Sequence, residues 1–327
     1  MMHLRVVCES GDSAAVTDLL KAEPGVVHLT VDAGAGRQPV GDVIEAAVAR
    51  QAAEGVLDRL AERGVPRHGQ VSLQLIDTML SDTADAAERA MPGEGADAII
   101  WDELVATAGE ESQLNPVFLA FLTIACLLAA VGVITNSAIT IVGAMVVSPD
   151  FGPLAALAVA IVGKRRDLAA SAALALGAGF PFAMLVTAAL TLLARGIGLF
   201  HPASLAELNQ VSYIYHVGPY SVIVAVLAGT AGMLALTSEK SGVLIGVFIS
   251  VTTVPAAGFA AVAAVAGDWP QCGGAVLQLL INLAGVTVAA TLTLLIRRRH
   301  IVLGPVPPAR SLRRPVTAAI SRPRRWS

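Results

Sequence analysis

The amino-acid sequence predicts a multi-span α-helical membrane protein of about six transmembrane helices, preceded by a soluble N-terminal α+β domain. Hydrophobic residues make up 55% of the 327 residues and charged residues only 14%, against about 25% charged residues in soluble domains. The imbalance is local, because residues 1–112 carry most of the acidic side chains whereas residues 114–296 contain very few charges. Six apolar stretches of about 20 residues, the length that crosses a bilayer, lie in that second region.

The first 80 residues have the pattern of a ferredoxin-like α+β domain. Strand-like alternation and helical spacing follow one another in the order βαββαβ, which is the split motif of that fold. A glycine-rich stretch, Ala33 to Gly36, is expected to form the turn between the second and third strands. The strands are expected at 3–9, 26–32, 42–48 and 71–77, and the helices at 13–21 and 52–63. This fold hosts many activities, so by itself it assigns none.

Residues 81–112 are expected to connect this domain to the membrane. Residues 81–96 are polar and contain glycine and proline, which is typical of a linker. Residues 97–111 have the spacing of an amphipathic helix, with Ile100 and Leu104 facing the membrane surface or the soluble domain.

The membrane domain is expected to occupy residues 113–300. Its six predicted spans are 116–134, 138–162, 168–194, 219–236, 243–266 and 275–296. The connections between the spans alternate between the two faces of the membrane. One face receives Lys164 to Arg166, Lys240 and Arg297 to Arg299, and the other receives Arg195. The positive-inside rule makes the first side cytoplasmic, and with no secretory signal at the start of the chain both termini are expected there. This predicts a multi-pass protein of the cell membrane.

The last segment, 301–327, is a basic cytoplasmic tail. Because it follows a membrane span directly, anionic lipid is a better partner for its arginines than nucleic acid. The three cysteines are too few and too scattered for a disulfide framework or a metal cluster, and no cofactor is expected.

Three spans on each side of the centre allow an inverted repeat. The second span of each half carries a Pro-x-x-Gly pattern, Pro149 to Gly152 in one and Pro255 to Gly258 in the other. Proline lacks an N–H group and clashes with the preceding turn, so each span is expected to kink or break and to free backbone groups that lipid cannot satisfy. Paired broken helices are a sequence sign of a transporter site at the bilayer midplane, although a purely structural kink in each helix remains the alternative.

Asp150 lies in the first of these interruptions. A carboxylate at the bilayer centre costs at least about 2.5 kcal/mol, so it is expected to be protonated, to bind a cation, or to face a half-helix. The alternative is a short re-entrant loop that leaves Asp150 in water. Hydroxyl and amide groups nearby complete a candidate substrate- or ion-binding set, which comprises Asp150, Ser148, Pro149, Gly152, Thr252, Thr253, Pro255, Asn136 and Asn282.

These segments resemble a bacterial membrane family known only as domain of unknown function 389. The resemblance rests on Asn136 to Met145, Ser148 to Pro153, Gly242 to Val247, Pro255 to Gly258 and Asn282 to Leu283, with Gly41 to Glu45 and Gly69 to Leu73 in the soluble domain. Two positions depart from the family pattern: Asp150 stands where a leucine-like residue is expected, and Val254 precedes Pro255 where a proline pair is usual. The family name implies the architecture and no activity.

The expected function is a transporter or channel-like protein for a small solute or ion, with a regulatory or oligomerising cytoplasmic domain. The alternative is a membrane-anchored sensor or assembly scaffold, which does not need broken helices. An enzyme is not expected, because the spans offer one carboxylate and no histidine. The expected partners are the lipid bilayer and an unknown solute or ion, and a homo-oligomer is compatible with the glycine- and alanine-rich helices.

Overall fold

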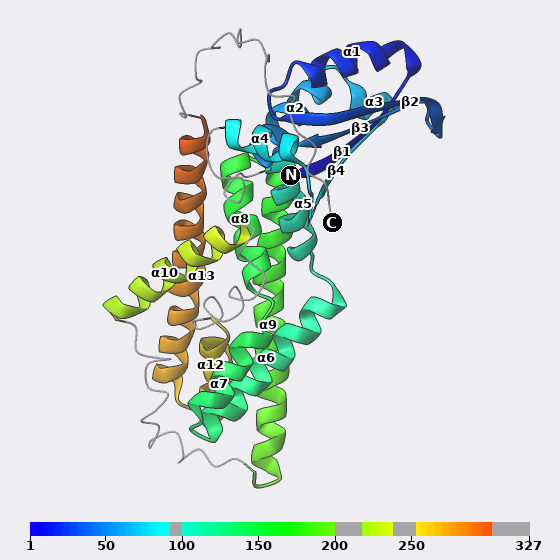
Figure 1. Cartoon of the computed structure of the whole chain (residues 1–327). Coiled ribbons are helices and arrows are strands. Elements are labelled where there is room, and N and C mark those ends of the chain that lie inside the picture. The colour runs from blue at the N-terminus through cyan, green and yellow to red at the C-terminus, as the bar shows by residue number, and fades with distance from the viewer. Residues whose placement is uncertain (77, 92–99, 200–217, 238–252, 303–327) are drawn as a thin grey trace, which may run out of the picture.

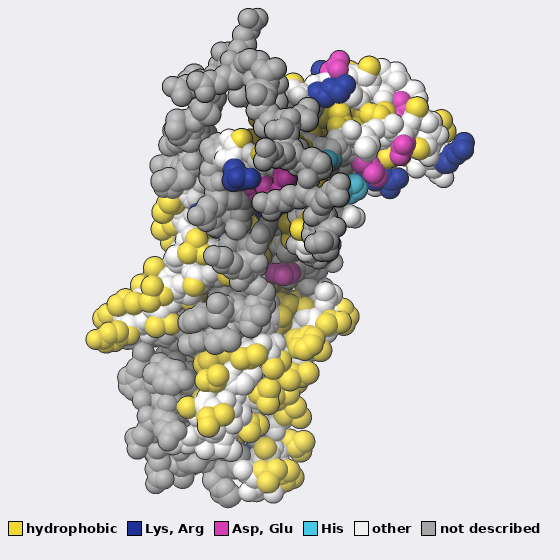
Figure 2. All heavy atoms as spheres, in the orientation of Figure 1, with side chains coloured by type: hydrophobic (Ala, Val, Ile, Leu, Met, Phe, Trp, Pro, Cys, Tyr) yellow, Lys and Arg dark blue, Asp and Glu magenta, His cyan; other side chains and the backbone are white. Residues whose placement is uncertain are grey.

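The computed structural model describes residues 1–76, 78–91, 100–199, 218–237 and 253–302 of the chain. It consists of a small sheet domain at one end and a body of helices beneath it, joined by a connecting helix (Figure 1). On the face drawn in Figure 2, charged side chains gather on the sheet domain, whereas hydrophobic side chains cover much of the helical body.

The sheet domain has four antiparallel strands in the order β2-β3-β1-β4. Its elements are β1 (Met2–Cys8), α1 (Ser10–Lys21), β2 (Val26–Arg37), β3 (Val40–Val48), α2 (Arg50–Glu62), α3 (Val65–His68) and β4 (Gln70–Leu75). In the central strand Leu4 lies opposite Ala46 on one side and Leu73 on the other. Alternate residues of β1 therefore point into a core closed by Val16 and Leu20 of α1 and by α2.

The glycine-rich stretch is not the hairpin turn that the sequence predicts. Strand β2 continues through Gly34 and Gly36 to Arg37, with an irregular register between Asp32 and Gly36, and the turn lies at Gln38 and Pro39. Gly34 has a φ of 65°, and its N–H donates to the carboxylate of Asp42 at 2.9 Å. The glycines therefore lie in a β-bulge within a longer strand.

Part of the predicted linker is a helix, α4 (Asp82–Ala90). Ser81 caps it by accepting a hydrogen bond from the N–H of Ala84 at 3.2 Å, and acidic residues occupy its first turn. Ala84 and Ala87 are buried beneath it. Residues 92–99 lie outside the described ranges, and the amphipathic helix that follows is α5 (Trp101–Glu111).

The helical body contains α6 (Pro116–Ile134), α7 (Ala138–Val147), α8 (Phe151–Gly163), α9 (Arg166–Gly196), α10 (Pro219–Leu236), α12 (Val254–Ala266) and α13 (Trp269–Val302). Among the described residues, four helices are long and apolar enough to cross a membrane: α6, α9, α10 and α13. A fifth span is added if α7 and α8, bent by 51° at their junction, are taken together. Of the predicted span 243–266, the structure describes only Thr253 onward, and α12 there is a short apolar helix.

Helix α12 lies inside the helical body. Its residues Val254 to Ala263 are buried, and it packs against α6, α9 and α13. The approach to α6 is close, because a Cβ at Gly258 would lie 2.7 Å from the Cβ of Ala129 and 2.9 Å from the carbonyl oxygen of Cys126. Small residues therefore allow this helix to be enclosed, as they do in other membrane helix packings. The outward faces of α9 and α10 expose large apolar side chains such as Leu185 and Leu227, as lipid-facing surfaces do.

Candidate functional site

The predicted interruption of the second span is present as a break between two helices. Helix α7 ends at Val147 and α8 begins at Phe151, so Ser148, Pro149 and Asp150 form the junction. Pro149 has no N–H to continue the helical ladder, and Pro153 falls within the first turn of α8, where the missing N–H costs little. The sequence therefore bends the chain at this point.

Asp150 is fully buried at the break, with 0% of its surface exposed. The hydroxyl of Ser148 donates to one carboxylate oxygen at 2.6 Å, and the hydroxyl of Thr253 donates to the other. Thr253 is 103 residues away in the chain and stands immediately before α12. The side chain of Asp150 thus joins the broken span to the start of a helix in the second half of the membrane domain.

The second predicted break is described from one side only. Thr253 occupies the N-cap position of α12, and Pro255 lies in its first turn, where proline is well tolerated. Thr252 lies outside the described residues. The described part therefore shows that Pro255 begins a helix at the same place where Thr253 meets Asp150.

Two helix N-termini meet at this carboxyl group. Asp150 is the N-cap residue of α8, yet its side chain makes no capping bond to that helix. The positive ends of α8 and α12 favour negative charge, as do the two hydroxyl donors. The arrangement can therefore hold an ionised carboxylate away from water, or exchange a proton or a cation at it.

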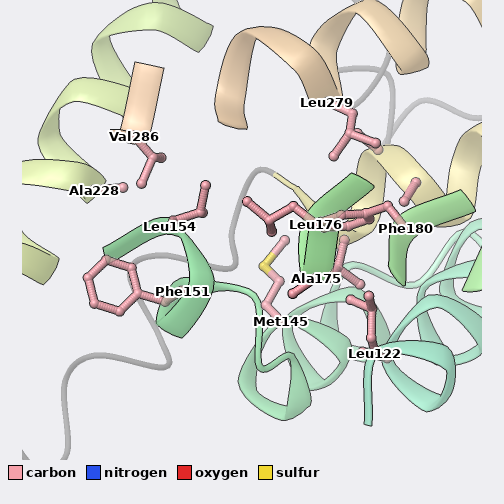
Figure 3. Packing of buried hydrophobic residues seen from close by; sticks show 14 of the residues in the cluster. Leu122, Met145, Phe151, Leu154, Ala175, Leu176, Phe180, Ala228, Leu279 and Val286 are labelled. Atoms are coloured by element: carbon pink, nitrogen blue, oxygen red, sulfur yellow. The ribbon is translucent and has the colours of Figure 1, made fainter. Parts of the chain in front are cut away.

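The surroundings of the break are apolar. Figure 3 shows Met145 and Phe151 on either side of the break, with Leu154, Leu176 and Val286 among the apolar side chains around it. All five are buried members of the main hydrophobic cluster. Solvent is thereby kept from the carboxyl group, which strengthens every electrostatic interaction that it makes.

A second carboxyl group, which the sequence analysis missed, lies beside the first turn of α8. A Cβ at Gly152 would lie 2.7 Å from the Cβ of Glu111 and 3.1 Å from its Oε2, so only glycine fits between α8 and the end of α5. Desolvation raises the pKa of the Glu111 carboxyl. In the sequence, Glu111 is only an acidic residue at the end of an amphipathic helix. It lies beside Gly152 because α5 packs antiparallel along α8.

Asn136 and Asn282 take other positions, and no hydrogen bond described in the structure joins either to Asp150. Asn136 has a φ of 49° in the turn between α6 and α7, a conformation that asparagine tolerates better than most residues. Asn282 is fully buried in α13 and accepts a hydrogen bond from the amide of Gln278 at 3.3 Å. Among the described residues, the buried Oε1 of Gln278 finds no hydrogen-bond partner. Of the predicted set, Ser148 and Thr253 bond to Asp150, and Pro149, Gly152 and Pro255 lie in the backbone beside them.

Two further features limit the chemistry of the helical body. Within the described ranges, no group of three or more His, Cys, Asp or Glu residues is placed to hold a metal ion. A cavity of about 790 Å³ between α8, α9, α12 and α13 is walled by apolar side chains such as Leu157, Phe180 and Leu279. The described lining of that cavity is therefore better suited to an apolar group than to a polar solute.

Comparison with known proteins supports the resemblance over part of the chain. Residues 145–288, which include the break and Thr253, match the family model described as a domain of unknown function, DUF389. The chain is also similar to an uncharacterized protein of the archaeon Methanocaldococcus jannaschii, with 24% identity over 237 residues that cover 72% of this chain and 70% of the relative. No solved structure matches the chain.

Proposed function

We propose that this protein moves a small solute or ion across the cell membrane, through a site formed where the α7–α8 break meets the start of α12. The observation that carries the proposal is the buried Asp150 carboxyl, bonded to Ser148 in its own segment and to Thr253 in the other half. A helix that only anchors a protein has no need of a buried carboxylate, which costs at least about 2.5 kcal/mol at the bilayer centre. Intramembrane acids of this kind typically mark ion or proton pathways.

The proposal keeps six spans, the fifth being 243–266, and relates the two halves as an inverted repeat. It is supported by the shared Pro-x-x-Gly pattern and by the meeting of the two interrupted segments at one carboxyl group. In transporters with such repeats, the substrate lies between half-helices whose ends face it.

The proposed orientation places both termini and the sheet domain in the cytoplasm. Its support is a basic cluster at the end of the helical body that carries that domain. Arg298 lies 5.0 Å from the ring of Trp101 and donates to the carbonyl oxygen of Val162 at 3.3 Å, close to Lys164 and its neighbours. Arg195 stands at the other end of α9, a 31-residue helix of about 46 Å. Basic residues concentrate on the cytoplasmic side of membrane proteins.

For the sheet domain we propose the ferredoxin-like fold, in view of its βαββαβ order and its strand order β2-β3-β1-β4. Its proposed role is regulation or oligomerisation. A sensor or scaffold without transport is the second candidate, and the observation that favours it is the firm attachment of α5 to the sheet domain. Ile100 lies in the core of that domain, and the N–H of Trp101 donates to the Glu54 carboxylate at 2.8 Å.

The test is charge movement in proteoliposomes on a solid-supported membrane, across a panel of cations, protons, amino acids and carboxylates. A solute-dependent current should be present in the wild type and absent in Asp150→Asn, which keeps the shape of the side chain and removes its charge. Thr253→Val should impair the current and Thr253→Ser should preserve it, because only the valine lacks the hydroxyl donor.

Asp268→Asn is the matched control. Asp268 caps α13 by accepting from the N–H of Gln271 at 3.1 Å and does not contact the break in the described structure. Its variant should keep the current. Full transport by correctly folded Asp150→Asn would remove this residue from the mechanism, and silence of the wild type across the whole panel would favour the sensor or scaffold.

A further inference from the structure

The sheet domain contains a cleft that the proposed transport site does not use. It lies between the edge strand β4, helix α2 and the beginning of α5, and its volume is about 420 Å³. Cavities that bind small molecules typically have about 300–1,000 Å³. We call it the β4–α2–α5 cleft. Leu75, at its mouth, is half exposed although it is a large apolar residue.

The side chains that line the cleft disfavour a charged ligand. Apart from Glu103 the side chains that line it are apolar, and they include Met2, Leu57, Leu73 and Ile100. The Glu103 carboxylate is already compensated by the Arg50 guanidinium, whose Nη2 lies 3.3 Å from Oε2. A charged occupant would lose its hydration without gaining an opposite charge, whereas a neutral one would bury apolar surface and keep the ion pair intact.

Helix α5 connects this cleft directly to the break. Its first residues form one wall of the cleft through Ile100 and Glu103, whereas Leu104 and Ala108 belong to the core of the helical body. Its last residue, Glu111, presses against the position of Gly152 in the first turn of α8. A single 11-residue helix, which is a rigid element, therefore contacts both places.

We propose that the β4–α2–α5 cleft binds a small, neutral, mostly apolar molecule, and that α5 transmits its occupancy to the break beside Asp150. The consequence for transport rests on the function proposed above, whereas the binding site and the response of α5 do not. An occupant that displaces the Ile100 end of α5 must also shift or tighten the Glu111 end, because the helix contacts Gly152 too closely to absorb a displacement.

The binding test uses the full chain in phosphatidylcholine nanodiscs and three probes of one shape: neutral 1-naphthalenemethanol, cationic 1-naphthylmethylammonium and anionic 1-naphthoate. After subtraction of empty nanodiscs, the neutral probe should bind saturably and at least about tenfold more tightly than either ion. Glu103→Gln should move the preference toward the anion, because it removes the negative charge from the lining of the cleft. Equal partition into empty nanodiscs, or tighter binding of either ion to the wild type, would overturn the site.

A matched pair of variants locates the probe. Ala61→Phe projects a ring into the cleft from α2 and should abolish saturable binding. Gln74→Phe places the same ring on the exposed opposite face of β4 and should leave binding unchanged. If Ala61→Phe binds the neutral probe as the wild type does, the cleft is not the site.

Hydrogen exchange tests the role of α5 without any transport measurement. The neutral probe should slow exchange in the C-terminal half of α5 in the wild type and in Gln74→Phe, and should have no such effect in Ala61→Phe. Binding that leaves the exchange of α5 unaltered would overturn the transmission while retaining the site. Probe binding and hydrogen exchange are measured without transport, so they can fail or succeed independently of the current measured with Asp150→Asn.

Discussion

A methyl group at Gly152 tests the contact between α5 and the broken span. In Gly152→Ala the new Cβ would lie 2.7 Å from the Cβ of Glu111 and 2.9 Å from its carbonyl oxygen, distances that real Cβ atoms do not tolerate. One of these neighbours is backbone, so a rotamer change cannot relieve both contacts, and α5 must move away from α8. Overpacking of this kind costs about 1–3 kcal/mol.

The matched control is Gly143→Ala, on α7 in the same broken span, where a Cβ would meet nothing within 4 Å. The two variants make the same chemical change, so their difference in unfolding free energy should be about 1–3 kcal/mol, with Gly152→Ala the less stable. Unfolding of the purified protein in mixed micelles by increasing SDS measures this difference. Adding Glu111→Gly removes one of the two clashing atoms and should restore part of the loss. Equal stability of Gly152→Ala and Gly143→Ala would refute the close packing of α5 on α8.

Three further predictions concern other parts of the chain. Hydrogen bonds from the Gly34 N–H and the Ser10 hydroxyl hold the pKa of Asp42 below its ordinary 3.8; its carboxylate therefore stabilises the sheet domain above that value. This stability should be lost as pH falls below 3.8 and through the lowered pKa of Asp42, and Asp42→Asn should flatten the dependence in thermal unfolding followed over pH. Asn136→Gly should leave transport intact and raise stability by up to about 1 kcal/mol, because glycine adopts a φ of 49° without strain; loss of current would instead return Asn136 to the site. Ile100→Ala, at a residue only 3% exposed, should destabilise the sheet domain by about 2–5 kcal/mol, seen as faster hydrogen exchange in β1 and α2, and an unchanged rate would contradict the docking of α5 there.

The sequence was a good guide where hydrophobic period and length decide the structure. The apolar stretch 116–134 is the helix Pro116–Ile134, because proline opens it at a position where the missing N–H is harmless. The sequence predicted the structure less well where the local composition favours one conformation and the tertiary packing another. The polar residues of 82–90 predict a linker, yet they form helix α4, in which Ala84 and Ala87 are buried. Gly34 and Gly36 indicated a turn, but pairing with β3 draws them into a strand.

The candidate site shows the same division. The break at Pro149 follows from the chemistry of proline and was predictable. The pairing of Thr253 with Asp150 brings together residues 103 positions apart, and the shared Pro-x-x-Gly pattern was the one hint of it in the sequence. Glu111 was not predictable, since it lies in the segment of soluble character and reaches Gly152 only because α5 runs along α8. Tertiary packing, which no local pattern encodes, decides both contacts.

The free energies at Asp150 bear on how the fold holds a carboxylate in the proposed transport site. Placing an ionised carboxylate at mid-membrane costs about 2.5–3.5 kcal/mol on insertion scales. Two hydrogen bonds to a charged group contribute about 1.5–3 kcal/mol each, and a favourable helix N-terminus adds up to about 2 kcal/mol. Together these favourable contributions equal or exceed the insertion cost, so the two hydroxyl donors and the helix N-terminus can offset the burial of a charged group at Asp150. In the proposed transport, a carboxylate held in this way can pair with an arriving cation, whereas the neutral amide of Asp150→Asn cannot.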